Sequence, residues 1–335
     1  MNTKEALKAN LKVDFKCGNK SNKEILKMNI QPRISEINHK TNKTYLAEKT
    51  WDVLDKEVTV NPFFKNTIKK VICIDSRFRS DYCNTSSTNF VVQLNFNLKN
   101  VISMRLESIE VPNTWYMISK KQGNNFFYII IGSTKYKITV PDGNYTSTSF
   151  VNWINANPFG AGIPAVPALP AGFVMVVNNQ TGKIDISYSS IFDLDFGKTE
   201  CGDCSFQRTL GWTMGYREIM YENSNNYESE GVFDSGGSRY FYVVVNDFNK
   251  NTNDFIIGNL KSSFINKNIL AKIPVVMDKF SMLYNEVEGR QTQQRDYFGP
   301  VNIERLQIQL LDEYGDIIDL NHMDFSIYLS FKMLY

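Results

Sequence analysis

Apolar and polar residues alternate in short runs from about residue 69 to the C-terminus, and turn residues bound each run. An alternation with a period of two puts successive side chains on opposite faces of an extended chain, so it predicts half-buried β-strands. Short connections rich in Gly, Asn and Ser between adjacent runs predict hairpins. The predicted strands are residues 70–74, 89–94, 100–111, 126–131, 135–140, 173–177, 183–188, 240–245, 268–275, 302–311, 317–320 and 325–334.

Helical segments are few and short in this sequence. Residues 146–155 predict one helix, and residues 204–211 predict a second that ends at its glycine. The polar stretches 222–238, 246–268 and 284–299 are predicted to be loops or irregular chain. Parallel α/β folds are excluded because the crossover helices are missing. About a dozen short strands with turns roughly every ten residues predict an all-β sandwich or barrel.

Two strands allow specific burial predictions. In the strand 100–111, Met104 and Leu106 share one face, and Ile109 lies on the other face. We expect Met104 and Leu106 to be buried in the core. Cys73 alternates with apolar residues in the strand 70–74 and is also expected to be buried.

Residues 1–66 differ from the rest of the chain in charge and in pattern, with about 13 basic and 8 acidic residues. Lysines recur at every fourth position: Lys4, Lys8, Lys12 and Lys16. Leu7, Leu11 and Phe15 fall on another face of the same helical projection, which is compatible with a short amphipathic helix. A solvated, mostly extended arm is the alternative, because isolated helices of this length are marginally stable. In a third interpretation, the arm orders only against a protein or anionic surface.

The stretch 157–173 is rich in Pro, Gly and Ala and carries no charge. Its three evenly spaced prolines favour polyproline II or irregular chain over a helix or a strand. The stretch is too apolar for a solubilising linker. It is interpreted either as a loop over the sandwich surface or as a loop that packs against a neighbouring subunit.

Composition excludes several classes of protein. The chain has 335 residues, of which 42% are hydrophobic, so wholesale disorder is excluded. The formal net charge is +2, whereas a dedicated nucleic-acid binder usually carries far more positive charge. No run of about 18 apolar residues predicts a transmembrane helix. The N-terminus contains regularly spaced lysines and lacks the apolar region that a secretory signal needs.

Five cysteines are present, and an odd number without a secretory signal disfavours a disulfide-stapled scaffold. Cys201 and Cys204 form a CxxC pair. A zinc site would need a second pair or two histidines at suitable spacing, and a thioredoxin-like site would need a following helix. Both residues are therefore interpreted as reduced thiols.

Catalytic signatures are missing from the sequence. There are only two histidines, His39 in the N-terminal stretch and His322 between the last strands, and no phosphate-binding, nucleophile-elbow or metalloprotease motif. Aspartates at 193, 195 and 203 are a weak calcium signal. A glycosidase-like pair could be drawn from four carboxylates whose mutual placement the sequence does not define: Asp75, Glu107, Glu110 and Asp142.

Seven spaced segments of the chain form one ordered set: Ile74–Arg79, Ser87–Phe90, Asn100–Leu106, Ser108–Tyr116, Val140–Tyr145, Leu210–Arg217 and Gln309–Gly315. In this order they resemble the minor capsid proteins of the nucleocytoplasmic large DNA viruses, or giant viruses. The resemblance covers about residues 70–335, and the segment IEVPNTWY is its most specific part. No motif of this kind occurs in residues 1–66.

This resemblance implies an all-β, jelly-roll-type antiparallel β-sandwich with long loop insertions in residues 67–335. The charge and pattern of residues 1–66 separately predict an extended basic arm that precedes the sandwich. One sandwich is favoured over two. The resemblance implies no enzymatic activity, no cofactor, no metal, no small-molecule substrate and no specific nucleic acid. The protein would be assembled in the host cytoplasm and lie in the virion beneath or between major capsid capsomers, which it would cement together.

Expected partners are the major capsid protein and other minor capsid proteins. An inner membrane or a membrane-associated viral protein is an additional candidate partner of the arm. Two alternatives stay open: a vertex (penton) protein of the same shell, and a carbohydrate- or receptor-binding sandwich with a shelf of exposed tryptophans. The residues expected to contact neighbours are Lys4, Lys8, Lys12, Lys16, Trp51, Arg77, Arg79, Pro164, Pro167 and Pro170.

Overall fold

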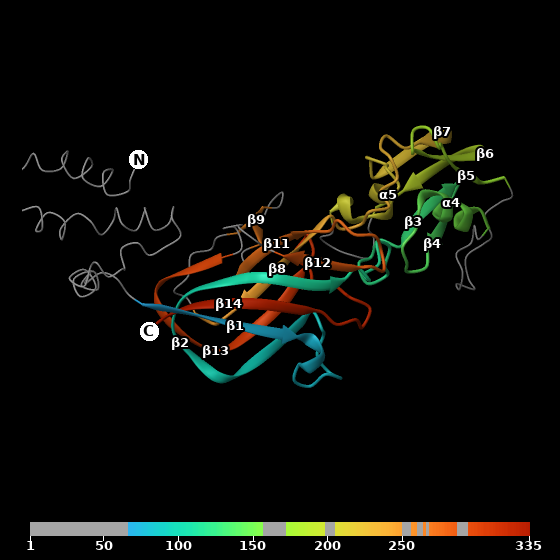
Figure 1. Ribbon diagram of the computed structural model, residues 1–335. Coiled ribbons are helices and arrows are strands. Elements are labelled where there is room, and N and C mark those ends of the chain that lie inside the picture. Colours follow the sequence, from blue (N-terminus) through green and yellow to red (C-terminus); the bar gives the residue numbers. More distant parts are fainter. Residues whose placement is uncertain are drawn as a thin grey trace, which may run out of the picture. The chain divides into compact units, whose positions relative to one another are not determined.

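The computed structural model describes residues 66–156, 172–197, 205–249, 256–259, 264–265, 268–286 and 294–335. Within these ranges almost all regular structure is antiparallel β-sheet, and the helices are short (Figure 1). The predicted all-β fold class is therefore confirmed. None of the helices in the described ranges is long and apolar enough to cross a membrane.

Seven strands form the larger sheet, which we call the main sheet, in the order β1-β14-β2-β13-β8-β11, with β12 paired to β2. The two longest strands, β2 and β13, run through its centre and pair with each other, for example Val92 with Leu306. The strands are β1 (Thr67–Asp75), β2 (Asn89–Pro112), β8 (Tyr240–Asn246), β11 (Ile269–Pro274), β12 (Met282–Glu286), β13 (Gln294–Leu311) and β14 (Ser326–Leu334).

The main sheet packs around a large hydrophobic core, and a smaller apolar cluster also includes residues of β8, β11 and β13. Strands β1, β2, β8, β11, β12, β13 and β14 all contribute buried side chains to the large core. One sheet can surround a core in this way because β-bulges bend and twist long strands, and β2 and β13 are interrupted by several register shifts. The largest fully buried side chains here are Leu98, Met104, Leu106, Ile109, Phe241 and Phe331.

Bulges also explain where strict alternation fails in β2. Met104 and Leu106 are fully buried, as predicted. Ile109, predicted on the opposite face, is fully buried as well. Leu106 pairs with Leu329 and Ser108 pairs with Tyr328, so the strand skips one residue at this point and its inward face changes parity.

The burial prediction for Cys73 was wrong, because this thiol is exposed. Its neighbour Ile74 is the buried member of the alternation in β1. In a half-buried strand only every second side chain faces the core, so Cys73 and Ile74 cannot both be buried.

A second sheet and a second core lie in the chain between β2 and β8. The strand order is β4-β3-β6-β5, and β7 also pairs with β6. Helix α4 contributes Phe150, Val151 and Ile154 to this core, which shares no residue with the core of the main sheet. Both predicted hairpins and the predicted helix lie here. The elements are β3 (Phe126–Ile131), β4 (Thr134–Thr139), α4 (Ser147–Ala156), β5 (Val174–Val177), β6 (Ile184–Asp195) and β7 (Met220–Glu228).

Short elements complete the described fold. A two-stranded ribbon joins β9 and β10. Instead of the helix predicted over 204–211, two single turns begin at Phe206 and Leu210. These elements are η2 (Ser76–Phe78), η3 (Phe206–Arg208), α5 (Leu210–Thr213), β9 (Gly258–Asn259) and β10 (Phe264–Ile265).

Four boundary predictions need correction. The predicted loops 222–238 and 284–299 contain β7, β12 and the start of β13. Residues 89–94 and 100–111 belong to one strand, and 317–320 provides only an isolated bridge from Ile317 to Leu311. β7 pairs only with β6, so most of its side chains face solvent and it lacks the apolar alternation by which strands are recognised.

Candidate functional site

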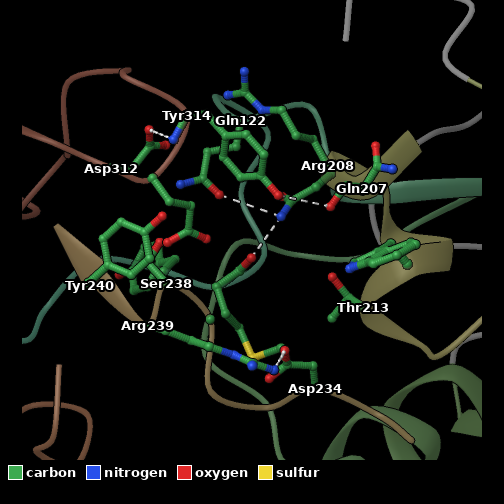
Figure 2. Close-up of a pocket in the computed structure, with 16 residues that line it drawn as sticks. Gln122, Gln207, Arg208, Thr213, Asp234, Ser238, Arg239, Tyr240, Asp312 and Tyr314 are labelled. Carbon is green, nitrogen blue, oxygen red and sulfur yellow. Dashed lines mark hydrogen bonds and ion pairs between the residues drawn. The ribbon is translucent and has the colours of Figure 1, made fainter. Parts of the chain in front are cut away.

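Three of the segments that carry the family resemblance meet around one cavity of about 380 Å³, which we call the junction cavity (Figure 2). Tyr116 reaches it from the chain after β2, and Trp212 from α5. Tyr314 reaches it from the turn after β13, and Tyr240 from the start of β8. Residues of both the main sheet and the second-sheet region therefore line the same space.

Asn113 organises the chain where β2 ends. Its side-chain amide donates to the backbone carbonyls of Met277 at 3.0 Å and Asp278 at 3.2 Å. Its backbone N–H donates to Ser281, and its carbonyl accepts from Phe280, both at 2.9 Å. One asparagine thus holds the turn before β12, which explains why a polar residue that is 1% exposed is tolerated here.

The segment LGWTMGYR forms the second-sheet side of the cavity. Thr209 caps α5 by accepting the N–H of Trp212. Gly215 has φ +96°, and a Cβ there would lie 2.3 Å from the carbonyl oxygen of Gly231. The N–H of Gly231 donates to Gly215 at 2.8 Å, so the two backbones are in direct contact. Only glycine combines that conformation with so close an approach.

The segment after β13 forms a turn around Asp312. The carboxylate oxygen Oδ1 accepts the N–H groups of Tyr314 and Asp316, both at 2.9 Å. Burial raises the pKa of Asp312, and these two donors oppose the rise. The carboxylate is committed to shaping the turn and is poorly placed for proton transfer.

Polar contacts connect the two sides of the junction. Arg208 forms an ion pair with Asp316, and its guanidinium lies 4.8 Å from the ring centroid of Tyr314. The Tyr314 hydroxyl donates to the carbonyl of Gln207 at 3.3 Å (Figure 2). These contacts fix the position of the two sides relative to each other. Each of them contributes little to stability, because ion pairs and cation–π contacts this exposed to solvent are weak.

Glu313 and Lys279 are two further perturbed ionisable groups near the junction. Burial, with a smaller contribution from Asp312, raises the pKa of Glu313 to about 7. Its Oε2 atom is buried without a hydrogen-bond partner among the described residues. Burial lowers the pKa of Lys279 to about 8, and its ammonium donates to Asn113 at 3.3 Å and to the Trp115 carbonyl at 3.4 Å.

The charge on Glu313 is expected to destabilise the fold at neutral and higher pH. The pKa is raised from 4.5 to about 7 in the folded chain, so the carboxyl favours folding below pH 4.5 and loses that contribution as pH rises to 7. Glu313→Gln should therefore raise stability at pH 8 by about 1–2 kcal/mol, after allowing for solvent screening.

Urea titrations of the Glu313→Gln variant and the parent at pH 8 and pH 4.5 measure this effect. The difference should shrink to near zero at pH 4.5. Glu304→Gln, at an exposed position on β13, is the matched control and should show no comparable pH dependence. An equal difference at both pH values would mean that the buried charge is not the cause.

Arg77 and Arg79 both pair with carboxylates of the main sheet. Arg77 contacts both oxygens of Asp75 and remains exposed. Arg79 is nearly buried, pairs with Asp324 at 2.6 Å and lies 3.9 Å from the ring centroid of Tyr82. Their role in contacting neighbours stays a prediction. The other predicted contact residues lie outside the described residues: Lys4, Lys8, Lys12, Lys16, Trp51, Pro164, Pro167 and Pro170.

The carboxylates considered for a glycosidase-like pair have structural partners. Glu107 pairs with Lys69 at 2.7 Å, and Asp142 accepts the backbone N–H of Lys120 at 2.7 Å. Within the described ranges no group of three or more His, Cys, Asp or Glu residues could hold a metal ion. Asp203 and the CxxC pair lie outside those ranges.

The three tryptophans in the described ranges do not form an exposed shelf. Trp115 is 3% exposed and packs edge-on against Phe241. Trp153 is partly buried against the second core. Trp212 is half-buried between the Phe206 ring and the Arg217 guanidinium. This burial removes the feature on which the carbohydrate-binding alternative depends.

In the sequence, Glu313 and Asn113 stand out only as members of resembling segments, and Lys279 belongs to none of them. Glu313 and Asn113 could have been selected as polar residues inside resembling segments. Lys279 lies in an ordinary stretch of the sequence, so no local pattern predicts its burial.

No protein-family model and no curated protein matches this sequence. Among solved structures, the mavirus penton protein aligns with 81% of this chain and 100% of its own, at 10% identity and a TM-score of 0.41. A chain in the cryo-EM structure of the Sputnik virophage aligns with 81% of this chain and 98% of its own, at 14% identity and a TM-score of 0.37.

Proposed function

We propose that this protein is a structural component of an icosahedral viral capsid, lying beneath or between the major capsid capsomers and joining them. The observation that carries the proposal is the convergence of three resembling segments at the junction cavity. Within these segments, Asn113, Gly215 and Asp312 hold backbone turns in place. The segments that resemble minor capsid proteins thus stabilise the fold, which supports a structural role for the protein.

The vertex of the same shell is the second candidate position. One of the aligned structures is named a penton protein, and the sequence resemblance is compatible with either position. Both candidates predict partners that are capsid proteins, and neither requires a substrate or a cofactor. They differ in symmetry, because a vertex protein surrounds a fivefold axis whereas a facet protein lies between sixfold capsomers.

A reconstruction of the assembled particle tests the role and decides the position. Density for the main sheet between facet capsomers would support the minor-capsid role, and density around the fivefold axes would support the vertex role. Failure of the chain to copurify with particles, with no matching density in the shell, would refute the capsid proposal.

The arm formed by residues 1–66 is proposed to contact neighbouring subunits without being part of the fold. Deleting residues 1–60 should leave the melting temperature of the free protein unchanged but abolish or weaken its incorporation into particles. The physical reason is that so few large apolar residues cannot offset the entropy of ordering this segment alone.

Thermal melting and incorporation in a virus carrying the deletion are the two measurements. Unfolding of the truncated protein would place the arm in the core. Normal incorporation would make the arm a passive tail. A variant in which Lys4, Lys8, Lys12 and Lys16 are replaced by Gln should show an intermediate defect, because the lysines supply steering and register more than affinity.

A further inference from the structure

A run of exposed apolar side chains covers the turn after β11 and the first residues of β12. Within nine residues, Val276 is 78%, Met277 43%, Phe280 70%, Met282 54% and Tyr284 56% exposed. We call these five residues the β12 ridge. Single exposed apolar residues are ordinary, but a contiguous group of this size is typical of an interaction surface.

The ridge is a built feature of the fold. Asn113 fixes the turn through hydrogen bonds to the carbonyls of Met277 and Asp278, and Lys279 points inward toward Trp115. Leu283, between two exposed ridge residues, is 1% exposed. The strand therefore has its inward residue in the core, and the outward residues cannot be buried by a rotation of β12.

An acidic groove of about 320 Å³ adjoins the ridge and shares Met282 with it. Three carboxylates line this groove. Asp75 pairs with Arg77 and Asp324 pairs with Arg79, so the excess of one negative charge lies at Glu110. Its floor is apolar in part, through Met323 and Phe325. The carboxylates are Asp75, Glu110 and Asp324.

We propose that the β12 ridge and the acidic groove bind residues 4–16 of a second copy of this chain. This rests on the proposed role of the arm as a contact between subunits, and it names the receiving surface. The segment 4–16 carries Leu7, Leu11 and Phe15 together with four lysines, so its apolar and basic character complements an apolar ridge beside an acidic groove.

Chain length allows this contact between copies. Fifty residues, 17–66, separate the binding segment from the start of β1. Extended chain spans about 3.3 Å per residue, so this connection reaches roughly 160 Å. A groove on an adjacent subunit is well within that range.

Such an interface is heterologous, because each copy offers an arm to one neighbour and a groove to another. Head-to-tail contacts of this kind close into a ring or continue as an open chain of subunits. The same sequence thus carries both halves of the contact, which predicts self-association of the isolated full-length protein.

Complementation between two full-length variants tests the proposal. The groove variant carries Met282→Lys and Tyr284→Lys, and the arm variant carries Leu7→Ser, Leu11→Ser and Phe15→Ser. In sedimentation velocity, the parent should form oligomers as concentration rises. Each variant alone should need at least about tenfold higher concentration, because two or three apolar side chains no longer become buried.

An equimolar mixture of the two variants should form 1:1 dimers and nothing larger. The groove variant still has an intact arm, and the arm variant still has an intact groove, so one contact can form. High salt should weaken this dimer. Val176→Lys with Ile191→Lys, at exposed positions of the second sheet, is the matched control and should associate like the parent.

Three outcomes would overturn the inference. If the full-length parent protein stays monomeric at all concentrations, the arm does not bind a second copy. Association of the groove variant at parental concentrations would mean that the receiving surface lies elsewhere. Failure of the mixture to form dimers would exclude the head-to-tail arrangement. None of these results affects the capsid proposal, which the particle reconstruction tests separately.

Discussion

Leu106→Asp should destabilise the main sheet by about 4 kcal/mol or more, because it places an unpaired charge in a dry core and removes buried packing. Leu106 is fully buried in β2, where it pairs with Leu329 of β14. The register shift beside it fixes which face of the strand is inward, so the aspartate cannot reach solvent by slipping one residue.

Urea denaturation followed by tryptophan fluorescence measures this loss. Val91→Asp, at a position of the same strand that is 44% exposed, is the matched control and should cost less than about 1 kcal/mol. If the aspartate variant does not fold, Leu106→Ala should still fold and lose about 2–5 kcal/mol. A parental unfolding midpoint for Leu106→Asp would show that this strand does not face the core.

Strands rich in aromatic and β-branched residues could be predicted from the sequence, and strands with other sources of stability could not. The hairpin of β3 and β4 and the run of β8 were predicted because each is rich in aromatic and β-branched residues. β7 was predicted to be a loop because most of its side chains face solvent, and its stability comes from backbone pairing with β6. Nothing in a local pattern distinguishes such a polar edge strand from a loop.

Bulges limited the burial predictions within correctly predicted strands. A single skipped residue reverses the inward face, so Met104 and Ile109 are both buried although they differ by an odd number of positions. The skip is set by pairing with β14, more than 200 residues away along the chain. A local reading of β2 cannot include that partner.

The candidate site was predictable only as a set of segments. The resemblance selected Tyr116, Trp212 and Glu313 among its motif residues, but gave no sign that they line one cavity. They lie close together because the chain leaves the main sheet after β2, forms the second sheet, and returns to the main sheet at β8. The perturbed pKa of Glu313 depends on burial that arises from this long-range arrangement.

A buried charge pair joins two stretches, 246–268 and 284–299, that the sequence predicted to be loops or irregular chain. Arg295 and Asp247 have side chains that are 4% and 1% exposed, with 3.6 Å between them. The guanidinium also donates to the carbonyls of Val245 and Asn268, each at 2.7 Å. Tyr297 donates to the Asp247 carboxylate, and burial raises the pKa of this phenol, so it stays a donor.

Arg295→Met should therefore cost about 3–5 kcal/mol, because it leaves the Asp247 carboxylate buried without its cation and removes the guanidinium hydrogen bonds to two carbonyls. Adding Asp247→Asn should restore part of the loss, since the stranded negative charge disappears while the Tyr297 hydrogen bond can persist. A coupling energy of about 1–3 kcal/mol is expected from the double-mutant cycle.

Urea titrations of the four proteins in the cycle provide that coupling energy. The Lys69→Met and Glu107→Gln pair is the matched control, because Lys69 is largely exposed and such pairs contribute about 0–1 kcal/mol. A double variant at Arg295 and Asp247 that is as unstable as the sum of the single variants would show that the two charges do not interact. The cost of Arg295→Met would then come from the carbonyls of Val245 and Asn268, whose unmade hydrogen bonds remain after Asp247 is neutralised.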